Sequence, residues 1–412
     1  MNEFDRALHQ QLEAVKAQGL YRELRTVFSA QGSRIILAGE TLLNFSSNDY
    51  LGLANDPQLK AAAIEAINRY GAGTGASRLI SGSLVPHREL DEAIADFKGT
   101  EAAVSFSTGY AAALGAICAL LGKEDIVVVD KLVHASIVDA ARLCGAKLRV
   151  FAHNDLNDLT EILQWADERH REATRVPTRP RVLIATESVF SMSGARAPLR
   201  ELVQLKDKYG AWLMVDEAHA TALYGTKGRG LAEELGVGDG IEIQMGTLGK
   251  ALGAAGGYIC GSRALIDYLI NRARSLIFST APVPAAAAAA TAGIRFVQSP
   301  AGQSRRELLW RRVAELNSGL GPPLPLFSSA IIPLPIGDET QAVEIATGLR
   351  RQGTYIPAIR YPTVARHSAR LRLTLTAAHT SADIAQALEA LKAVGLFPRC
   401  VAALPSTHAA VR

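Results

Sequence analysis

The sequence has little excess charge and no long apolar run. Its 412 residues carry 44 Lys and Arg against 40 Asp and Glu, a formal net charge of +4, and no basic block runs through it. A protein that binds nucleic acid usually concentrates basic residues on one surface, so nucleic acid is not the expected partner. No stretch of about 18 or more apolar residues occurs, so we expect no membrane-spanning segment.

Cysteine is also scarce. The four cysteines lie far apart, in no spacing typical of a metal site or a redox pair: Cys118, Cys144, Cys260 and Cys400. Residues 1–20 contain acids and lack the apolar core of a signal peptide. We therefore expect no disulfide, no metal and a cytoplasmic location.

Hydrophobic residues make up 48% of the chain and charged residues 20%, as in a globular protein. From about residue 100, short apolar segments alternate with helical patterns. This alternation predicts an α/β fold with a mostly parallel sheet covered by helices on both faces, and ligands bind such sheets at the carboxyl ends of the strands. The expected strands are 102–106, 126–130, 148–153, 181–187, 211–219, 241–246 and 257–262.

The two ends of the chain have other patterns. Residues 4–18 predict an amphipathic helix, and residues beyond about 300 predict an α+β arrangement of helices and strands. Pro282, Pro284 and an alanine run predict a helix that links the domains. The expected organisation is an N-terminal helix and strand segment (1–47), a large domain (48–290) and a smaller C-terminal α+β domain (291–412).

A glycine-rich segment, GAGTGASRLISG, covers residues 71–82. Gly71, Gly73 and Ala76 satisfy the G-x-G-x-x-A pattern of dinucleotide-binding proteins, which requires a strand before it and a helix after it. Here a helical pattern precedes it and no clear helix opens directly after it. We therefore interpret the segment as a loop that lines a site or an interface.

A second glycine-rich stretch, QMGTLGKALGAAGGY, places Lys250 among small and apolar residues. Loss of water around an amine disfavours its charged form and makes it a better nucleophile. Five glycines in the stretch let backbone approach a bound group closely. The alternative is a glycine-rich turn whose lysine reaches water.

Asp216 gives Lys250 a chemical partner. It ends the apolar strand WLMVD, and a buried carboxylate needs a cation or several donors to stay ionised. A lysine for a Schiff base and an acid for a protonated pyridine nitrogen together are typical of a pyridoxal 5′-phosphate site. The alternative role for Asp216 is a helix cap or a loop hydrogen bond.

Two histidines follow strand ends. His219 lies three residues after Asp216, so both side chains can point into one pocket, although a single histidine is more often structural. His134 follows IVVVD. Its imidazole can stack on a flat ring or cap the next helix.

The chain resembles the α-oxoamine synthases, a family of fold-type I (aspartate aminotransferase-like) pyridoxal-phosphate enzymes. Two of the matching motifs, FAHND and RLRLTLTAAH, favour the branch of the family that acts in biotin synthesis. The motifs run in the same order along nearly the whole chain: NFSSNDYLGL (44–53), GTGASRLISG (73–82), STGYAA (107–112), DKLVHAS (130–136), FAHNDL (151–156), ESVFSMSG (187–194), DEAHATALYGTKGRG (216–230), TLGKALGAAGG (247–257), IRYPTV (359–364) and RLRLTLTAAH (370–379).

The resemblance implies a role for each matching residue around the cofactor. Lys250 is expected to form the Schiff base and act as the base, and Asp216 to hold the pyridinium nitrogen. His134 is expected to stack on the ring. The remaining cofactor contacts are expected from Ser191 and His219 at the ring oxygen, and from Gly109, Tyr110 and Thr247 at the phosphate and ring.

The resemblance also implies the substrate contacts. Asn48 and Arg372 are expected to bind the carboxylate of the amino acid, a task that suits the guanidinium fork. Arg370 is the alternative, because residues 370 and 372 share one face of a strand. Arg22 and Thr363 are expected at the acyl donor or the domain interface.

The sequence departs from the family pattern at three positions. Tyr361 and Ala365 interrupt the IRPPTVP segment, and Ala222 replaces the glycine of DEAHATG. These changes leave the cofactor residues intact but affect the acyl-donor side.

The implied reaction is a decarboxylative condensation of L-alanine with a pimeloyl thioester, carried by coenzyme A or an acyl carrier protein. It gives an amino-oxo acid, carbon dioxide and free thiol. The resemblance further implies a homodimer with sites at the subunit interface, where GTGAS and STAPVP contribute. The alternatives are another α-oxoamine synthase such as glycine C-acetyltransferase, an inactive binding subunit, and a nucleotide-binding Rossmann protein.

Overall fold

The computed structural model describes residues 1–172, 180–321 and 327–396. Contacts divide the chain into two units. Unit 1 contains residues 1–52, 192–194 and those from 308 onward, and unit 2 contains residues 53–191 and 195–307. These bounds differ from the sequence-based division near residues 47 and 290, because the N-terminal segment packs with the C-terminal part of the chain.

Unit 2 is built around a seven-stranded sheet in the order β3-β9-β8-β7-β6-β4-β5. Only β9 within it pairs antiparallel, with β3 and β8, so the predicted mostly parallel sheet is confirmed. Each strand that was expected is present. The strands are β3 (Ala102–Phe106), β4 (Ile126–Asp130), β5 (Lys147–Phe151), β6 (Val182–Glu187), β7 (Trp212–Asp216), β8 (Ile243–Thr247) and β9 (Gly257–Gly261).

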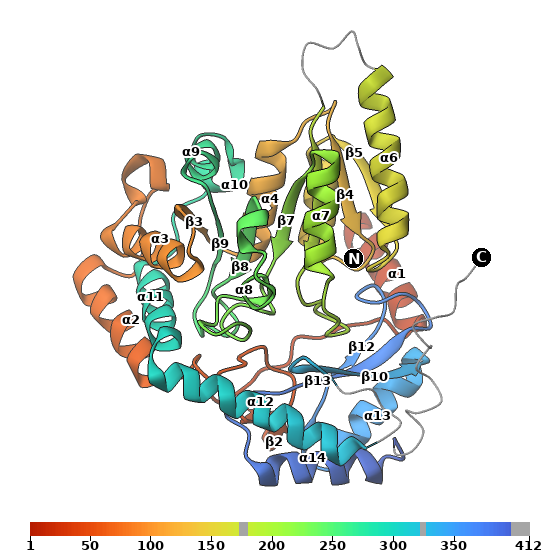
Figure 1. Cartoon of the computed structure of the whole chain (residues 1–412). Helices are drawn as coiled ribbons and strands as arrows, with labels where there is room; N and C mark the ends of the chain where they lie inside the picture. The colour runs from red at the N-terminus through yellow and green to blue at the C-terminus, as the bar shows by residue number, and fades with distance from the viewer. Residues whose placement is uncertain (173–179, 322–326, 397–412) are drawn as a thin grey trace. The chain divides into compact units, whose positions relative to one another are not determined.

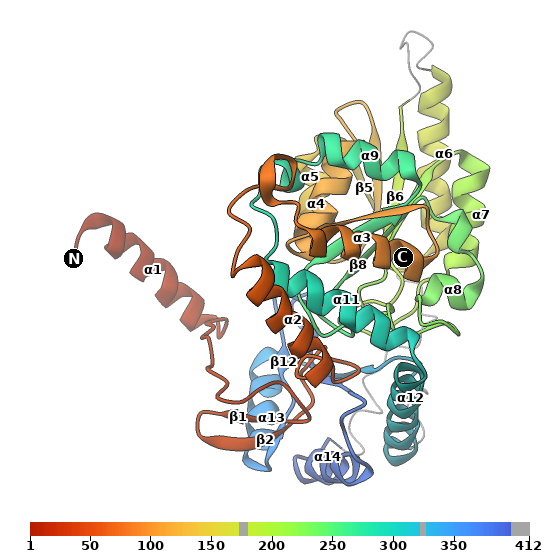
Figure 2. The ribbon, with the colours of Figure 1, turned by 90° about the vertical axis from the view of Figure 1, so that its left-hand side faces the viewer.

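Helices cover both faces of this sheet. Figure 2 shows α4, α5 and α9 on one side and α6, α7 and α8 on the other. Burial on both faces explains why the central strands are apolar along their whole length. The helices of unit 2 are α2 (Pro57–Tyr70), α3 (Val85–Lys98), α4 (Gly109–Leu120), α5 (Ala135–Leu143), α6 (Leu156–Glu172), α7 (Leu199–Tyr209), α8 (Leu231–Leu235), α9 (Arg263–Arg272), α10 (Arg274–Ile277) and α11 (Pro284–Gln298).

The absence of a clear helix after the first glycine-rich segment was a wrong prediction. A short π-helical turn at Arg78–Gly82 leads directly into α3. Leu90, Ile94 and Phe97 are buried at helical spacing, a pattern that could have predicted α3. Helix α2 precedes the segment, so the strand–glycine–helix order of a dinucleotide site is not formed.

Unit 1 contains two small three-stranded sheets, as expected for an α+β arrangement. Residues 354–359 form two short strands in different sheets, because β11 joins β2 and β12 joins β13. The strands are β1 (Arg34–Leu37), β2 (Glu40–Asn44), β10 (Ile331–Gly337), β11 (Thr354–Tyr355), β12 (Ala358–Ile359) and β13 (Ala369–Thr374) (Figure 1).

The helices of unit 1 begin at the N-terminus, where the predicted amphipathic helix is confirmed as α1 (Glu3–Ala17) and has no buried residue. Helix α12 (Pro300–Leu320) starts in unit 2 and continues into unit 1. Helices α13 (Glu339–Arg351) and α14 (Ser381–Ala393) complete it. The segment after Phe397 lies outside the described residues. Among the residues that are described, no helix combines the length and the apolar character that a membrane span requires.

Helix α11 packs closely against the loop that carries Lys250. At Gly293 the helix lies so near that an added Cβ would overlap the carbonyl oxygen of Leu252. The alanines of the same helix are also small enough for α11 to pack on α2 and α3. The alanine run is therefore structural, and it fixes one side of the Lys250 loop.

Replacing Gly293 by alanine should destabilise the protein, because backbone atoms rather than a flexible side chain must move. We expect Gly293→Ala to lower the free energy of unfolding by about 1–3 kcal/mol. Gly348→Ala on α13 is the control, since its Cβ would meet only the side chain of Val394 and should change stability by less than about 1 kcal/mol. Urea unfolding measures both, and equal stabilities would contradict the close packing.

Candidate active site

Polar residues gather at the carboxyl edge of the large sheet. Glu187, Asp216 and Thr247 are the last residues of β6, β7 and β8. His134 follows β4 and Gly109 opens α4 after β3. Since these strands run in one direction, their ends meet at one edge, where parallel sheets bind ligands.

The structure brings Lys250 and His219 together. Lys250 Nζ lies 2.7 Å from His219 Nε2, although the two residues are far apart in sequence. His219 is buried and Lys250 is half-buried. A lysine amine and an imidazole at this distance can share or exchange a proton, so this pair is a candidate for acid–base work.

Asp216 is buried at the end of β7. Its Oδ1 accepts a hydrogen bond from the N–H of Ala218 at 2.8 Å. Burial raises the pKa of Asp216, while Lys250, the Ala218 N–H and His134 act in the opposite direction. A cation bound against this carboxylate would offset the cost of burial, as the sequence interpretation requires.

His134 is the N-cap of α5. Its Nδ1 accepts a hydrogen bond from the N–H of Ser136 at 3.2 Å and lies 2.8 Å from the Ser136 hydroxyl. Desolvation lowers the pKa of His134, so the ring is neutral at neutral pH. The residue remains exposed, and capping through Nδ1 leaves the face of the ring available for stacking.

The start of α4 provides main-chain donors. Gly109 and Tyr110 lie in its first turn, where N–H groups have no acceptor within the helix. A Cβ on Gly109 would stand 4.0 Å from Thr247 Oγ1, so the residues expected at the phosphate are neighbours. Such a helix start suits an anion. The Tyr110 hydroxyl itself donates to Asp139 at 2.6 Å.

The glycines around Lys250 mostly allow parts of the protein to approach one another. Added Cβ atoms at four of them would overlap neighbouring protein atoms: Gly246 against Tyr258, Gly253 against Leu53, Gly256 against Phe106, and Gly257 against Gly109. At Gly249 the nearest atom would be 3.5 Å away. The expectation that these glycines make room for a bound group therefore needs correction, since packing accounts for all but Gly249.

Sequence reasoning missed Glu187. This side chain is buried, and its Oε2 accepts a hydrogen bond from the N–H of Ser191 at 3.1 Å. Burial and then the charge of Asp216 raise the pKa of Glu187 to about 8. The signal was present, because LIATE ends in an acid after an apolar strand just as WLMVD does.

In unit 1 the structure brings Arg372 and Asn48 together. Arg372 Nη2 donates to Asn48 Oδ1 at 3.0 Å, and Nη1 donates to Thr374 Oγ1 at 2.9 Å. Arg372 is buried. Arg370 is half-buried, and its Nη1 lies 3.5 Å from the carbonyl oxygen of Met192. The two arginines therefore have different surroundings despite lying on one strand.

Arg22 and Thr363 also lie in unit 1 and are exposed. Arg22 Nη2 is 3.3 Å from the carbonyl oxygen of Tyr361, and the Thr363 N–H donates to the Arg360 carbonyl at 3.0 Å. The guanidinium of Arg366 lies 4.5 Å from the ring centre of Tyr361. The residue that departs from the family pattern is thus packed into the same surface as the expected acyl-donor contacts.

Ala222, which also departs from the family pattern, has an unusual backbone conformation. It is buried with φ of 70°, a left-handed conformation that costs an alanine about 1–2 kcal/mol. Its N–H donates to the Gly228 carbonyl at 2.8 Å. The glycine of the family pattern is therefore explained by the backbone here, and this chain adopts the same turn with alanine.

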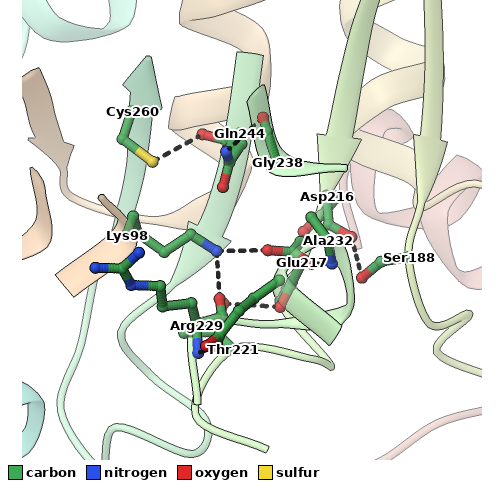
Figure 3. Close-up of polar contacts among 12 residues, drawn as sticks. Lys98, Ser188, Asp216, Glu217, Thr221, Arg229, Ala232, Gly238, Gln244 and Cys260 are labelled. Carbon is green, nitrogen blue, oxygen red and sulfur yellow. Dashed lines mark hydrogen bonds and ion pairs between the residues drawn. The ribbon is translucent and has the colours of Figure 1, made fainter. Parts of the chain in front are cut away.

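A buried ion pair supports the segment after Asp216. Asp216 and Glu217 point to different sides, and Glu217 meets Lys98 from α3 (Figure 3). The other carboxylate oxygen of Glu217 accepts from the Ala232 N–H at 2.9 Å. Burial alone would lower the pKa of Lys98, but the Glu217 carboxylate outweighs it and the pKa is raised.

A cavity of about 910 Å³ in unit 2 is lined by Lys98 and Glu217 but not by Asp216, His219 or Lys250. It includes Trp212 and Ile243, the first residues of β7 and β8, so it extends towards the amino edge of the strands. Several of its charged groups already have partners: Lys98 pairs with Glu217, and Glu242 with Lys206. The candidate site is therefore identified by chemistry rather than by cavity size. It is the carboxyl edge of the large sheet around Lys250, Asp216 and His219, which we call the Lys250 edge.

Comparison with known proteins agrees with this geometry. The sequence profile of aminotransferase class I and II matches residues 40–391. The chain belongs to this family. The match covers all of unit 2 and most of the described part of unit 1, so the large sheet and the residues around Lys250 lie within the matched range.

Similar sequences extend over the full length. The 8-amino-7-oxononanoate synthase of Geobacter sulfurreducens is 46% identical over 95% of this chain and 98% of its own. That of Thermoanaerobacter pseudethanolicus is 41% identical over 94% and 96%. The resemblance to α-oxoamine synthases is thereby confirmed.

Solved structures of family members share the fold. The serine palmitoyltransferase of S. paucimobilis, with a bound PLP–myriocin aldimine, has a TM-score of 0.87 at 30% identity, covering 98% of this chain and all of that one. The 8-amino-7-oxononanoate synthase of Francisella tularensis has a TM-score of 0.70 at 28% identity, covering 85% and 97%. The predicted fold-type I architecture is confirmed.

Removing the charge of Lys98 should leave Glu217 buried and unpaired. We expect Lys98→Met to lower the free energy of unfolding by about 3–5 kcal/mol, with partial recovery when Glu217→Met is added. Lys392→Met breaks an exposed pair with Glu389 and should cost less than about 1 kcal/mol. Denaturant unfolding compares the three variants, and similar losses for Lys98→Met and Lys392→Met would contradict a structural role for the buried pair.

Proposed function

We propose that the chain is an 8-amino-7-oxononanoate synthase. It condenses L-alanine with a pimeloyl thioester and releases 8-amino-7-oxononanoate, carbon dioxide and free thiol, in biotin synthesis. The main support is identity of 41–46% to synthases of this name over nearly the full length of each chain. The Lys250 edge supplies a set of side chains that suits this chemistry.

The cofactor is pyridoxal 5′-phosphate, for which the described residues fit well. Lys250 would bind the cofactor through its amine, buried Asp216 would pair with the pyridine nitrogen, and the exposed face of His134 would stack on the ring. Ser191 and His219 bind the ring oxygen, and the start of α4 binds the phosphate together with Thr247. When bound, the cofactor takes up the electron pair left at the α-carbon of alanine.

The Lys250–His219 pair serves as the acid–base group of the reaction. Lys250 Nζ would be the base that removes the α-proton of alanine. His219 Nε2, at 2.7 Å from that nitrogen, can accept or return a proton. Asp216 keeps the pyridine nitrogen protonated, because a charged partner offsets the cost of its own burial.

Arg372 and Asn48 bind the carboxylate of alanine. The Arg372 guanidinium is buried and oriented by Thr374 and Asn48, so little side-chain entropy is lost when a substrate binds. Arg370 has weaker contacts, at 3.3 and 3.5 Å. These differences support Arg372 over Arg370.

Arg22 and Thr363 contact the acyl donor, whose carrier is either coenzyme A or an acyl carrier protein. Both residues are exposed on one part of unit 1, and Tyr361 lies beside them. A guanidinium there suits an anionic group on the donor.

A homodimer is supported by an apolar surface in unit 2. Ser77 pairs with Thr280, and the Ala281 N–H donates to the Ala76 carbonyl at 3.0 Å, so the GTGAS and STAPVP segments lie side by side. Ile80 and Phe278 next to them are 82% and 70% exposed. A second copy that covers this surface removes large apolar side chains from water.

The proposal predicts the product. Purified protein with pyridoxal 5′-phosphate, L-alanine and either pimeloyl-CoA or pimeloyl-ACP should give 8-amino-7-oxononanoate, detected by mass spectrometry. Lys250→Ala should abolish both turnover and the absorbance of the lysine-bound cofactor. Lys227→Ala, an exposed lysine, should keep both. Product with glycine and acetyl-CoA but none with alanine would instead identify a glycine C-acetyltransferase.

The carboxylate site is tested by two matched arginine variants. We expect Arg372→Ala to weaken alanine binding by on the order of tenfold to a hundredfold, the loss of charge-assisted hydrogen bonds. Arg370→Ala should change it by less than about threefold, since its contacts are longer. Titration of the cofactor absorbance with alanine measures both. The reverse order of effects would assign the role to Arg370.

A further inference from the structure

Glu187 is a buried acid that the proposed mechanism does not use. It pairs in register with Asp216, across the parallel strands β6 and β7. Register partners on neighbouring strands project from the same face of a sheet, about 5 Å apart. Two carboxyl groups therefore share one buried region, although the cofactor offers a single cationic nitrogen to this edge.

The contacts of Glu187 link the residues on either side of the ring site. Its Oε2 accepts from the N–H of Ser191. Its Oε1 is buried and makes no hydrogen bond within the part of the chain that the structure describes. The main-chain N–H of His134 acts on the same carboxyl and lowers its pKa somewhat. Glu187 thus lies between the Ser191 and His134 segments.

The surroundings favour placing the negative charge on Asp216. Lys250, the Ala218 N–H and His134 all stabilise the charged form of Asp216. At Glu187, Lys250 and the N–H groups of Ser191 and His134 also favour the charged form, but burial and the charge of Asp216 outweigh them and raise its pKa to about 8. Two like charges this close in a buried site cannot both form cheaply, so one group keeps its proton.

We propose that Glu187 is a positioning residue that works as the neutral acid: it holds the Ser191 segment and leaves Asp216 as the single negative charge beneath the cofactor. The role of Glu187 in catalysis rests on the proposed function. Its protonation does not, and it can be measured on the protein without cofactor or substrate.

The proton on Glu187 has a measurable effect on stability. In the unfolded chain the carboxyl loses its proton at the ordinary glutamate pKa, whereas in the folded protein it keeps the proton up to about pH 8. Its contribution to stability is therefore greatest at low pH and is lost as the pH rises through this window. Glutamine keeps the acceptor for Ser191 but cannot titrate.

The first experiment compares thermal unfolding of the full chain without cofactor for the natural protein, Glu187→Gln and Glu201→Gln. Glu201 is an exposed acid on α7 and serves as the control. The unfolding temperature of Glu187→Gln minus that of the natural protein should rise by several degrees between pH 5.5 and 8.5. The difference for Glu201→Gln should stay nearly constant. A flat difference for Glu187→Gln would overturn the proposal.

The second experiment separates positioning from charge. Glu187→Gln should retain turnover to within about threefold, whereas Glu187→Ala should lose on the order of tenfold or more, because the Ser191 N–H then lacks its acceptor. Any alkaline change in the pH–rate profile due to Glu187 should vanish in Glu187→Gln. Equal losses in both variants would show that a charged Glu187 is needed, and would overturn the proposal. Failure of the alanine reaction itself would leave the unfolding result standing.

Discussion

A buried ion pair between Lys98 and Glu217 holds the residue that directly follows Asp216. Asp216 is the last residue of β7 and interacts with Lys250, whereas the next residue, Glu217, pairs with Lys98 of α3 (Figure 3). The pair holds Glu217, while the Ala232 N–H and the main chain at Met245 fix the same turn. A group held in this way restricts the neighbouring main chain, so the pair also helps to fix the position of Asp216.

The sequence predicted the candidate site residues better than the buried residues that hold them in place. Lys250 and Asp216 were identified because a lysine among small residues and an acid at a strand end are together typical of a pyridoxal-phosphate site, and His219 because it lies close to Asp216 in the sequence. Lys98 was missed, since a lysine near a helix end is normally solvated. Only the fold shows that α3 brings this lysine to Glu217. Its role comes from a long-range contact that no local pattern encodes.

The glycines illustrate the same limit. Their number around Lys250 indicated close approach, but the approaching atoms belong to Tyr258, Leu53, Phe106 and Gly109 rather than to a ligand. The sequence shows where a glycine stands, but it does not show which neighbouring atoms leave no room for a side chain there. By contrast, the strands of unit 2 were predictable, because burial on both faces leaves continuous apolar segments that local pattern detects.

Charge balance ties these observations together. Three acids lie next to one another at the carboxyl edge of the sheet. Glu187 pairs in register with Asp216, and Glu217 follows Asp216 in the chain. Glu217 is neutralised by Lys98, and Lys250 and the Ala218 N–H favour the charged form of Asp216. Glu187 has no cation of its own among the described residues, so a proton is the remaining way to remove its charge. We propose that the bound cofactor neutralises Asp216 and that a proton neutralises Glu187, so that three neighbouring acids can be buried in one place.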